Sequence, residues 1–167
     1  MDWKKLFNEK RPDEILNVRL PVTWTDRIME YAALLTLLAM WVVAAILYRQ
    51  SIGSDVAIHI NAAGDVDEIA APESLLIVAG MWTFVMLLLG FSAYRPRLIN
   101  PGTKVTTVKQ LKLMVTQVRV MNIVMGFMGI CILLAMVHQE PLWILISALV
   151  LFIVVVVFSV LIRRARK

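Results

Sequence analysis

Charged residues are scarce in this chain, and four long stretches contain none. Lysine, arginine, aspartate and glutamate make up 17% of the 167 residues, whereas 60% are hydrophobic and the mean hydropathy is +0.78. The uncharged stretches are Tyr31 to Tyr48, Leu75 to Tyr94, Val120 to Val137 and Leu142 to Ile162. Each has about the 20 residues that a helix needs to cross a hydrocarbon layer of about 30 Å. The composition therefore excludes an ordinary soluble domain and predicts a membrane protein.

Three further absences narrow the classes of function. Cys131 is the only cysteine, so no intrachain disulfide can form, and its place in the third apolar stretch predicts a packing role. No small-residue cleavage pattern follows Tyr48, so the first apolar stretch is expected to remain as a helix rather than to act as a signal peptide. No nucleophile paired with a catalytic base stands out. We therefore expect neither an enzyme nor a cofactor.

The positive charge has an uneven distribution that predicts the topology. Six Lys or Arg residues precede the first apolar stretch, six lie between the second and third, and four follow the last; only Arg49 lies elsewhere. Because basic residues stay on the cytoplasmic side, both ends of the chain are expected there. The net charge of +5 is then a topology signal and a complement to anionic lipid head groups, and no nucleic-acid partner is expected.

The sequence predicts an all-α integral membrane protein with four transmembrane helices and a structured extracytoplasmic loop between the first two. An interfacial helix is expected before Pro12, a helix cap at Thr23 or Thr25, and another at Thr106 or Thr107, where an amphipathic helix feeds into the third span. The expected segments are 1–27 (cytoplasmic), 28–49 (first span), 50–73 (outer loop), 74–94 (second span), 95–118 (cytoplasmic loop), 119–138 (third span), 139–141 (outer turn), 142–162 (fourth span) and 163–167 (basic tail).

Two features of the third span predict how the helices pack. The turn "HQEP" is too short for anything but a tight hairpin, so the third and fourth spans should be antiparallel neighbours. Gly126 and Gly129 are small enough to let another helix approach closely. We expect these two glycines to serve helix packing inside one protomer. The sequence does not decide whether the protein forms a homo-oligomer.

The outer loop, 50–73, is expected to contain a short strand. In "DVAIHIN" the apolar residues Val56, Ile58 and Ile60 alternate with the others, which is the pattern of a strand that covers a core with one face. These three side chains are therefore expected to face the helices. Pro72 suits the first turn of the second span.

The polar residues that follow predict a turn and a surface cluster. In "NAAGD" Gly64 is free to adopt positive φ, and Asn61 and Asp65 are suited to Asx-type hydrogen bonds. His59 and Asp67 should lie on the same outer surface. The cluster is also expected to include Glu68 and, from the second hairpin, His138 and Glu140.

Three roles are open to this cluster. The side-chain oxygens of Asn61, Asp65, Asp67 and Glu68 are ligands that suit a divalent cation, although their spacing is not that of a calcium-binding loop. His59 beside carboxylates is suited to acid–base chemistry, but a lone histidine usually serves as a structural hydrogen-bonding group. In the third and commonest case the polar side chains only tie the turn together.

The stretch "IHINAAGDVD" resembles the signature P-x-H-[FW]-[ND]-x-x-G-x-[AVP]-[DN] of a bacterial membrane domain of unknown function that is found in the SdpI family of immunity proteins. "TDRIMEYAALLTLLAMWV" and "LINPGTKVT" extend the resemblance to roughly residues 23–124. Ala57 stands where the family usually has proline. The resemblance implies a short four-span form in the bacterial cytoplasmic (inner) membrane, with His59, Asn61, Gly64, Asp65 and Asp67 at signature positions.

These observations favour a non-enzymatic binding or protective module that acts through its outer loop. Some members of the resembled family protect the producing cell against its own secreted peptide toxin, which implies an extracytoplasmic peptide or protein as ligand. The alternative is a small transport or divalent-cation-binding membrane protein. The four apolar stretches carry no charged residue, and this absence counts against an ion pathway.

Overall fold

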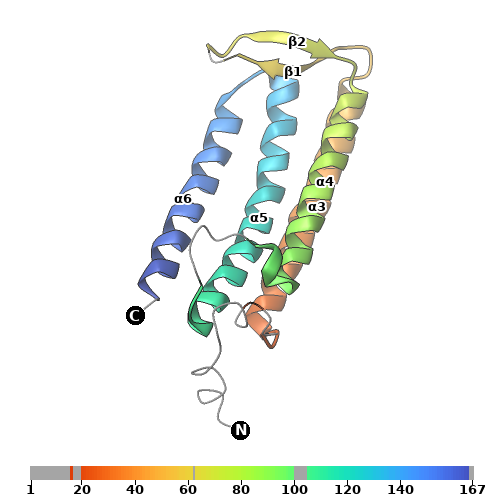
Figure 1. Cartoon of the computed structure of the whole chain (residues 1–167). Coiled ribbons are helices and arrows are strands. Elements are labelled where there is room, and N and C mark those ends of the chain that lie inside the picture. Colours follow the sequence, from red (N-terminus) through yellow and green to blue (C-terminus); the bar gives the residue numbers. More distant parts are fainter. Residues whose placement is uncertain (1–15, 17–19, 62, 100–104, 166–167) are drawn as a thin grey trace.

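The structure, a computed structural model, describes residues 16, 20–61, 63–99 and 105–165, which form four long helices and one β-hairpin (Figure 1). In chain order the elements are α3 (Trp24–Gln50), β1 (Val56–Ile60), β2 (Val66–Ala70), α4 (Glu73–Tyr94), the short 3-10 helix η1 (Pro96–Leu98), α5 (Val108–His138) and α6 (Leu142–Arg164). The interfacial helix expected before Pro12 and the last two residues of the basic tail lie outside the described residues.

Capping boxes start two of the helices. The Thr23 hydroxyl accepts a hydrogen bond from the Asp26 backbone N–H at 3.3 Å, and the Asp26 carboxylate accepts one from the Thr23 N–H at 2.7 Å. Thr107 and Gln110 repeat this arrangement at the start of α5. Each box satisfies backbone N–H groups that have no partner within the helix. Of the alternatives predicted from the sequence, Thr23 and Thr107 are the caps.

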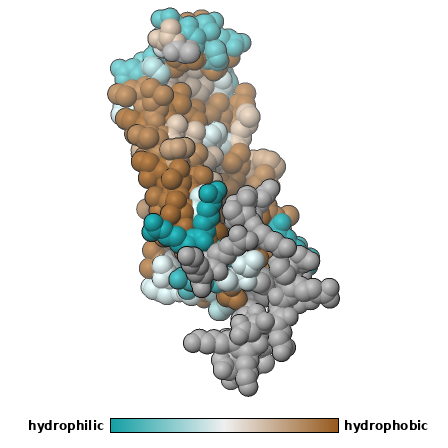
Figure 2. Space-filling model, turned by 60° about the vertical axis from the view of Figure 1, so that its left-hand side comes forward, coloured by the Kyte–Doolittle hydropathy of each residue, from teal (hydrophilic) through white to brown (hydrophobic). Residues whose placement is uncertain are grey.

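All four helices are long and apolar enough to cross a membrane, so their length and composition support the prediction of a membrane protein. The expected amphipathic segment and third span form the single helix α5, whose 31 residues extend over about 46 Å. This length exceeds a hydrocarbon layer of about 30 Å. Figure 2 shows a broad hydrophobic belt between a hydrophilic end and a mixed end. Leu35, Phe84 and Phe152 are each more than 60% exposed, as suits side chains that face lipid.

Helix α5 is the centre of the bundle, and α3, α4 and α6 all pack against it. A Cβ atom at Gly126 would lie 2.7 Å from Cβ of Thr36, and one at Gly129 would overlap Trp82, so both glycines are required for the close approach of α3 and α4. The Trp82 indole donates a hydrogen bond to the Met125 carbonyl at 2.6 Å. The prediction that these glycines serve packing inside one protomer is confirmed.

Helices α5 and α6 are antiparallel neighbours, as the short turn predicts (Figure 1). At the end opposite the hairpin, Gln110 is 1% exposed and its side-chain amide donates to the Ile162 carbonyl at 2.9 Å. Thr107 donates its hydroxyl to the Ala165 carbonyl at 3.2 Å. The first turn of α5 thus provides donors for carbonyl groups at the end of α6, which lack partners in their own helix.

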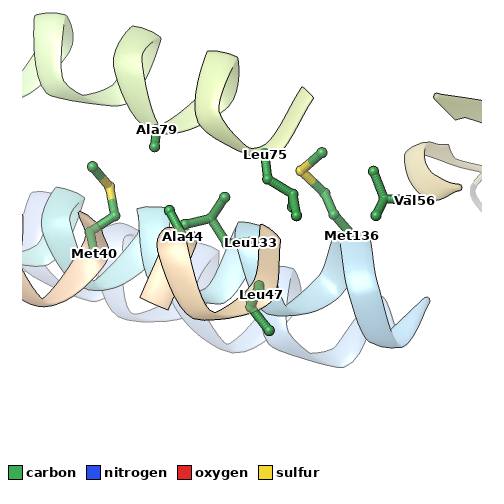
Figure 3. Packing of buried hydrophobic residues seen from close by; sticks show 8 residues of the cluster. All are labelled: Met40, Ala44, Leu47, Val56, Leu75, Ala79, Leu133 and Met136. Atoms are coloured by element: carbon green, nitrogen blue, oxygen red, sulfur yellow. The ribbon is translucent and has the colours of Figure 1, made fainter. Parts of the chain in front are cut away.

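A β-hairpin lies across one end of the bundle (Figure 1). Strands β1 and β2 are antiparallel and form a two-stranded sheet. Val56 of β1 lies beside Met136 of α5 and belongs to the main core cluster (Figure 3). The other members come from the helices and are Met40, Ala44, Leu47, Leu75, Ala79 and Leu133. One strand residue therefore anchors the hairpin in the helical core.

The alternation predicted for β1 is only partly correct. Val56 and Ala57 are 2% and 1% exposed, whereas Ile58 is 43% exposed and Ile60 is half-buried. The prediction that Ile58 faces the helices was wrong. The pairing register shifts between Ala57 and His59, and such a shift interrupts the two-residue period of a strand.

Candidate functional site

The loop between β1 and β2 is closed by both the backbone and the side chain of Asn61. Its N–H donates to the Asp65 carbonyl at 2.9 Å, and its own carbonyl accepts from the Gly64 N–H at 3.0 Å. Its side-chain oxygen accepts from the backbone N–H groups of Ala63 at 2.9 Å and of Asp65 at 3.0 Å. Asn61 therefore makes four hydrogen bonds to the described residues of this loop.

Gly64 and Asp65 have different roles in the loop. Gly64 has a φ of +94°, a conformation that glycine adopts without the penalty that a side chain brings, so the prediction of positive φ is confirmed. Glycine in this region is common in hairpin connections of three to five residues. Asp65 contributes its backbone N–H and carbonyl to the loop, rather than the side-chain bond that its sequence position suggests.

His59 and Asp67 meet on the exposed surface of the hairpin. Nδ1 of His59 lies 2.5 Å from Oδ1 of Asp67, and the two side chains are 60% and 47% exposed. Within the described residues, the Nε2 atom of His59 has no hydrogen-bond partner. The pair therefore presents an imidazole ring and a carboxylate side by side to solvent. We call it the His59–Asp67 pair.

Of the other members of the predicted surface cluster, Glu68 is the cross-strand partner of His59. The tip of the hairpin reaches the turn between α5 and α6, because a Cβ at Gly64 would lie 3.6 Å from Cγ of Pro141. His138 and Glu140, on either side of that turn, are exposed. Among residues 20–61, 63–99 and 105–165, no three His, Cys, Asp or Glu side chains are placed to hold a metal ion. The oxygen ligand set suggested by the sequence is therefore not assembled as a metal site.

A second polar group lies at the end of the bundle opposite the hairpin. The Arg119 guanidinium is 7% exposed, with Nη1 at 3.0 Å from Oδ1 of Asp26 and Nε at 3.2 Å from Oε1 of Glu30. The Tyr94 hydroxyl donates to the same Glu30 oxygen at 2.6 Å, and its ring centre lies 5.7 Å from the guanidinium carbon. We call these four residues the Arg119 cluster.

The Arg119 cluster ties three helices together, since Asp26 and Glu30 belong to α3, Tyr94 to α4 and Arg119 to α5. Reasoning from the sequence missed it. Arg119 is one of the six basic residues between the second and third apolar stretches, whose positions the topology alone explains. The available signal was their placement, because charges that flank apolar stretches on different helices tend to pair inside the bundle.

The two polar groups are suited to different tasks. The Arg119 cluster has its hydrogen-bonding atoms turned towards one another, which suits it to fixing the relative positions of helices. The His59–Asp67 pair is exposed, and a loop with four internal hydrogen bonds supports it. Of these two polar groups, the His59–Asp67 pair is therefore the one that presents exposed side chains for contact with another molecule.

Searches of protein-family models, of curated proteins and of solved structures found no match to this chain.

Proposed function

We propose that the protein is a non-enzymatic binding or protective module of the bacterial cytoplasmic membrane that acts through its β1–β2 hairpin on the outer side. The observation that carries this proposal is the exposed His59–Asp67 pair, which is supported by a closed loop and anchored by Val56 in the helical core. A binding surface benefits from such rigidity, because less conformational freedom is lost when a ligand binds.

The charge distribution supports the proposed orientation. The described end opposite the hairpin carries basic residues at the end of α4 and the start of α5, including Arg95, Arg97, Lys109 and Lys112. The described residues at the hairpin end include one Lys or Arg, which is Arg49. The acidic residues there are Asp55, Asp65, Asp67, Glu68 and Glu73. Because Lys and Arg are retained on the cytoplasmic side, this asymmetry favours an external hairpin.

The surface chemistry of the hairpin suits a peptide ligand. Ile58 and Ile69 are 43% and 57% exposed on neighbouring strands, close in the chain to His59 and Glu68. A peptide can use both apolar contacts and hydrogen bonds on such a mixed surface. The resemblance of "IHINAAGDVD" to the signature of the SdpI family, which includes immunity proteins against secreted peptides, supports the same class of ligand.

The test is the sensitivity of cells that lack the protein to a panel of secreted bacterial peptide toxins. We expect a lower inhibitory concentration for at least one peptide, with protection restored by the unchanged protein but not by the His59→Ala or Asp67→Ala variant. The matched controls are His138→Ala and Glu140→Ala, which remove the same kinds of group from exposed positions at the same end of the bundle.

Equal expression of all four variants, measured in membrane fractions, would show that lost protection is not lost protein. Unchanged sensitivity to every peptide would count against the protective role. If protection is lost equally in the His59→Ala and His138→Ala variants, the His59–Asp67 pair is not the specific binding feature.

A further inference from the structure

A cavity of about 1140 Å³ lies at the end of the bundle opposite the hairpin. Its walls come from the residues just before α3, the end of α4, η1 and the early turns of α5. Leu20, Phe91 and Val115 provide apolar surface, whereas Arg95, Arg97 and Lys112 provide charge. This volume is somewhat larger than the range of about 300–1,000 Å³ that is usual for small-molecule sites in proteins.

The charge of this cavity is strongly positive. Among the residues that the structure describes, four basic side chains line it, those of Arg95, Arg97, Lys112 and Arg119, against one acidic side chain, that of Asp26. Arg119 and Asp26 form an ion pair with each other, at 3.0 Å. Three cationic groups therefore remain to act on a ligand, and their field favours an anion.

The cavity lies where the apolar stretches end. Tyr94, in its wall, is the last residue of the second apolar stretch, and Arg119 immediately precedes the third. In a membrane-spanning bundle this level corresponds to the boundary between hydrocarbon and head groups. A molecule held here meets lipid tails on one side and water on the other.

We propose that this cavity binds an anionic phospholipid. The phosphate lies at Arg95 and Lys112, and an acyl chain lies against the apolar wall. Basic pockets between membrane helices are suited to lipid head groups, since the cations neutralise the phosphate charge. The apolar residues distinguish the site from one for a soluble anion, which gains nothing from contact with Phe91 or Val115. The proposal is independent of the function of the hairpin.

The experiment is native mass spectrometry of the full chain in detergent micelles, titrated with dioleoyl-phosphatidylglycerol or with dioleoyl-phosphatidylcholine. We expect Kd for the first bound phosphatidylglycerol molecule to be at least about fivefold lower than Kd for phosphatidylcholine. A factor of about five is the effect of one basic side chain on the binding of an anionic head group. Lys112→Gln should raise Kd for phosphatidylglycerol about fivefold, and Arg95→Gln with Lys112→Gln by more than tenfold.

The matched control is Lys109→Gln, because Lys109 is also exposed in the early turns of α5 but does not line the cavity. It should leave the phosphatidylglycerol affinity unchanged, and Lys112→Arg should retain it. The thermal midpoint of each variant in lipid-free detergent shows whether the fold is intact.

Three results would overturn the proposal. Equal affinity for the two lipids would show that the cavity does not select an anionic head group. Equal weakening by Lys109→Gln and Lys112→Gln would indicate a diffuse surface charge rather than a site. Inorganic phosphate that binds as tightly as phosphatidylglycerol, with the same loss in Lys112→Gln, would assign the cavity to a soluble anion instead.

Discussion

Removal of the Arg119 guanidinium should destabilise the protein strongly. Arg119→Leu leaves Asp26, whose side chain is 9% exposed, and Glu30, whose side chain is 31% exposed, without their cationic partner. An uncompensated buried charge costs about 3–5 kcal/mol. The loss should lie towards the lower end of that range, since Glu30 retains contact with solvent and with the Tyr94 hydroxyl.

The structure also predicts how the stabilisation is divided between the two acidic partners. Double-mutant cycles with Asp26→Asn and Glu30→Gln should give a coupling free energy of about 2 kcal/mol for the pair of Arg119 with Asp26. The pair with Glu30, at 3.2 Å and one-third exposed, should give about 1 kcal/mol or less. The difference follows from solvent screening at Glu30.

The measurement is the free energy of unfolding in mixed detergent micelles, from circular dichroism as the dodecyl sulfate fraction is raised. Arg27→Gln is the control, since Arg27 is exposed and adjoins Asp26 in the chain. It should change the free energy by less than about 0.5 kcal/mol. The reasoning is refuted if Arg119→Leu behaves like this control, or if both acidic partners give the same coupling.

The same unfolding measurement tests three further predictions. Gly126→Ala should cost about 1–3 kcal/mol, because the new methyl group would overlap Thr36, whereas Gly80→Ala, with no atom within 4 Å, should be neutral or stabilising. Gly64→Ala should cost about 1–2 kcal/mol from backbone strain alone, since Pro141 leaves room for the methyl group; equal stability would contradict the positive φ. Gln110→Ala should cost about 1–3 kcal/mol because buried backbone groups lose their partners, and a neutral effect would remove Gln110 as a tie between α5 and α6.

Much of the helical architecture is predictable from the sequence, because its signals are local. The lengths of the apolar stretches predict four spanning helices. A threonine followed three residues later by Asp or Gln, whose side chain can accept a hydrogen bond from the threonine N–H, predicts the starts of α3 and α5. The conformation of Gly64 and the bonds of Asn61 are also local properties of a short loop. Each feature depends on residues close together in the chain.

The remaining features depend on contacts that a local pattern does not contain. Strand β2, with the sequence VDEIA, has two adjacent acidic residues and weak strand propensity, so only pairing with β1 reveals it. The exposure of Ile58 results from a register shift between the strands. The Arg119 cluster joins residues that are 89 and 93 positions apart in the chain. No helical or strand period specifies such a pairing.

The central claim, that the β1–β2 hairpin faces the outside of the cell, is tested most directly by cysteine labelling. In a Cys131→Ala background, Ala63→Cys places a thiol at the exposed hairpin loop, and Lys109→Cys places one at the exposed start of α5. With a membrane-impermeant maleimide and a permeabilised outer membrane, we expect the Ala63→Cys variant to be labelled in whole cells. The Lys109→Cys variant should be labelled only after lysis. The reverse pattern would contradict the proposed orientation and, with it, an extracytoplasmic ligand for the His59–Asp67 pair.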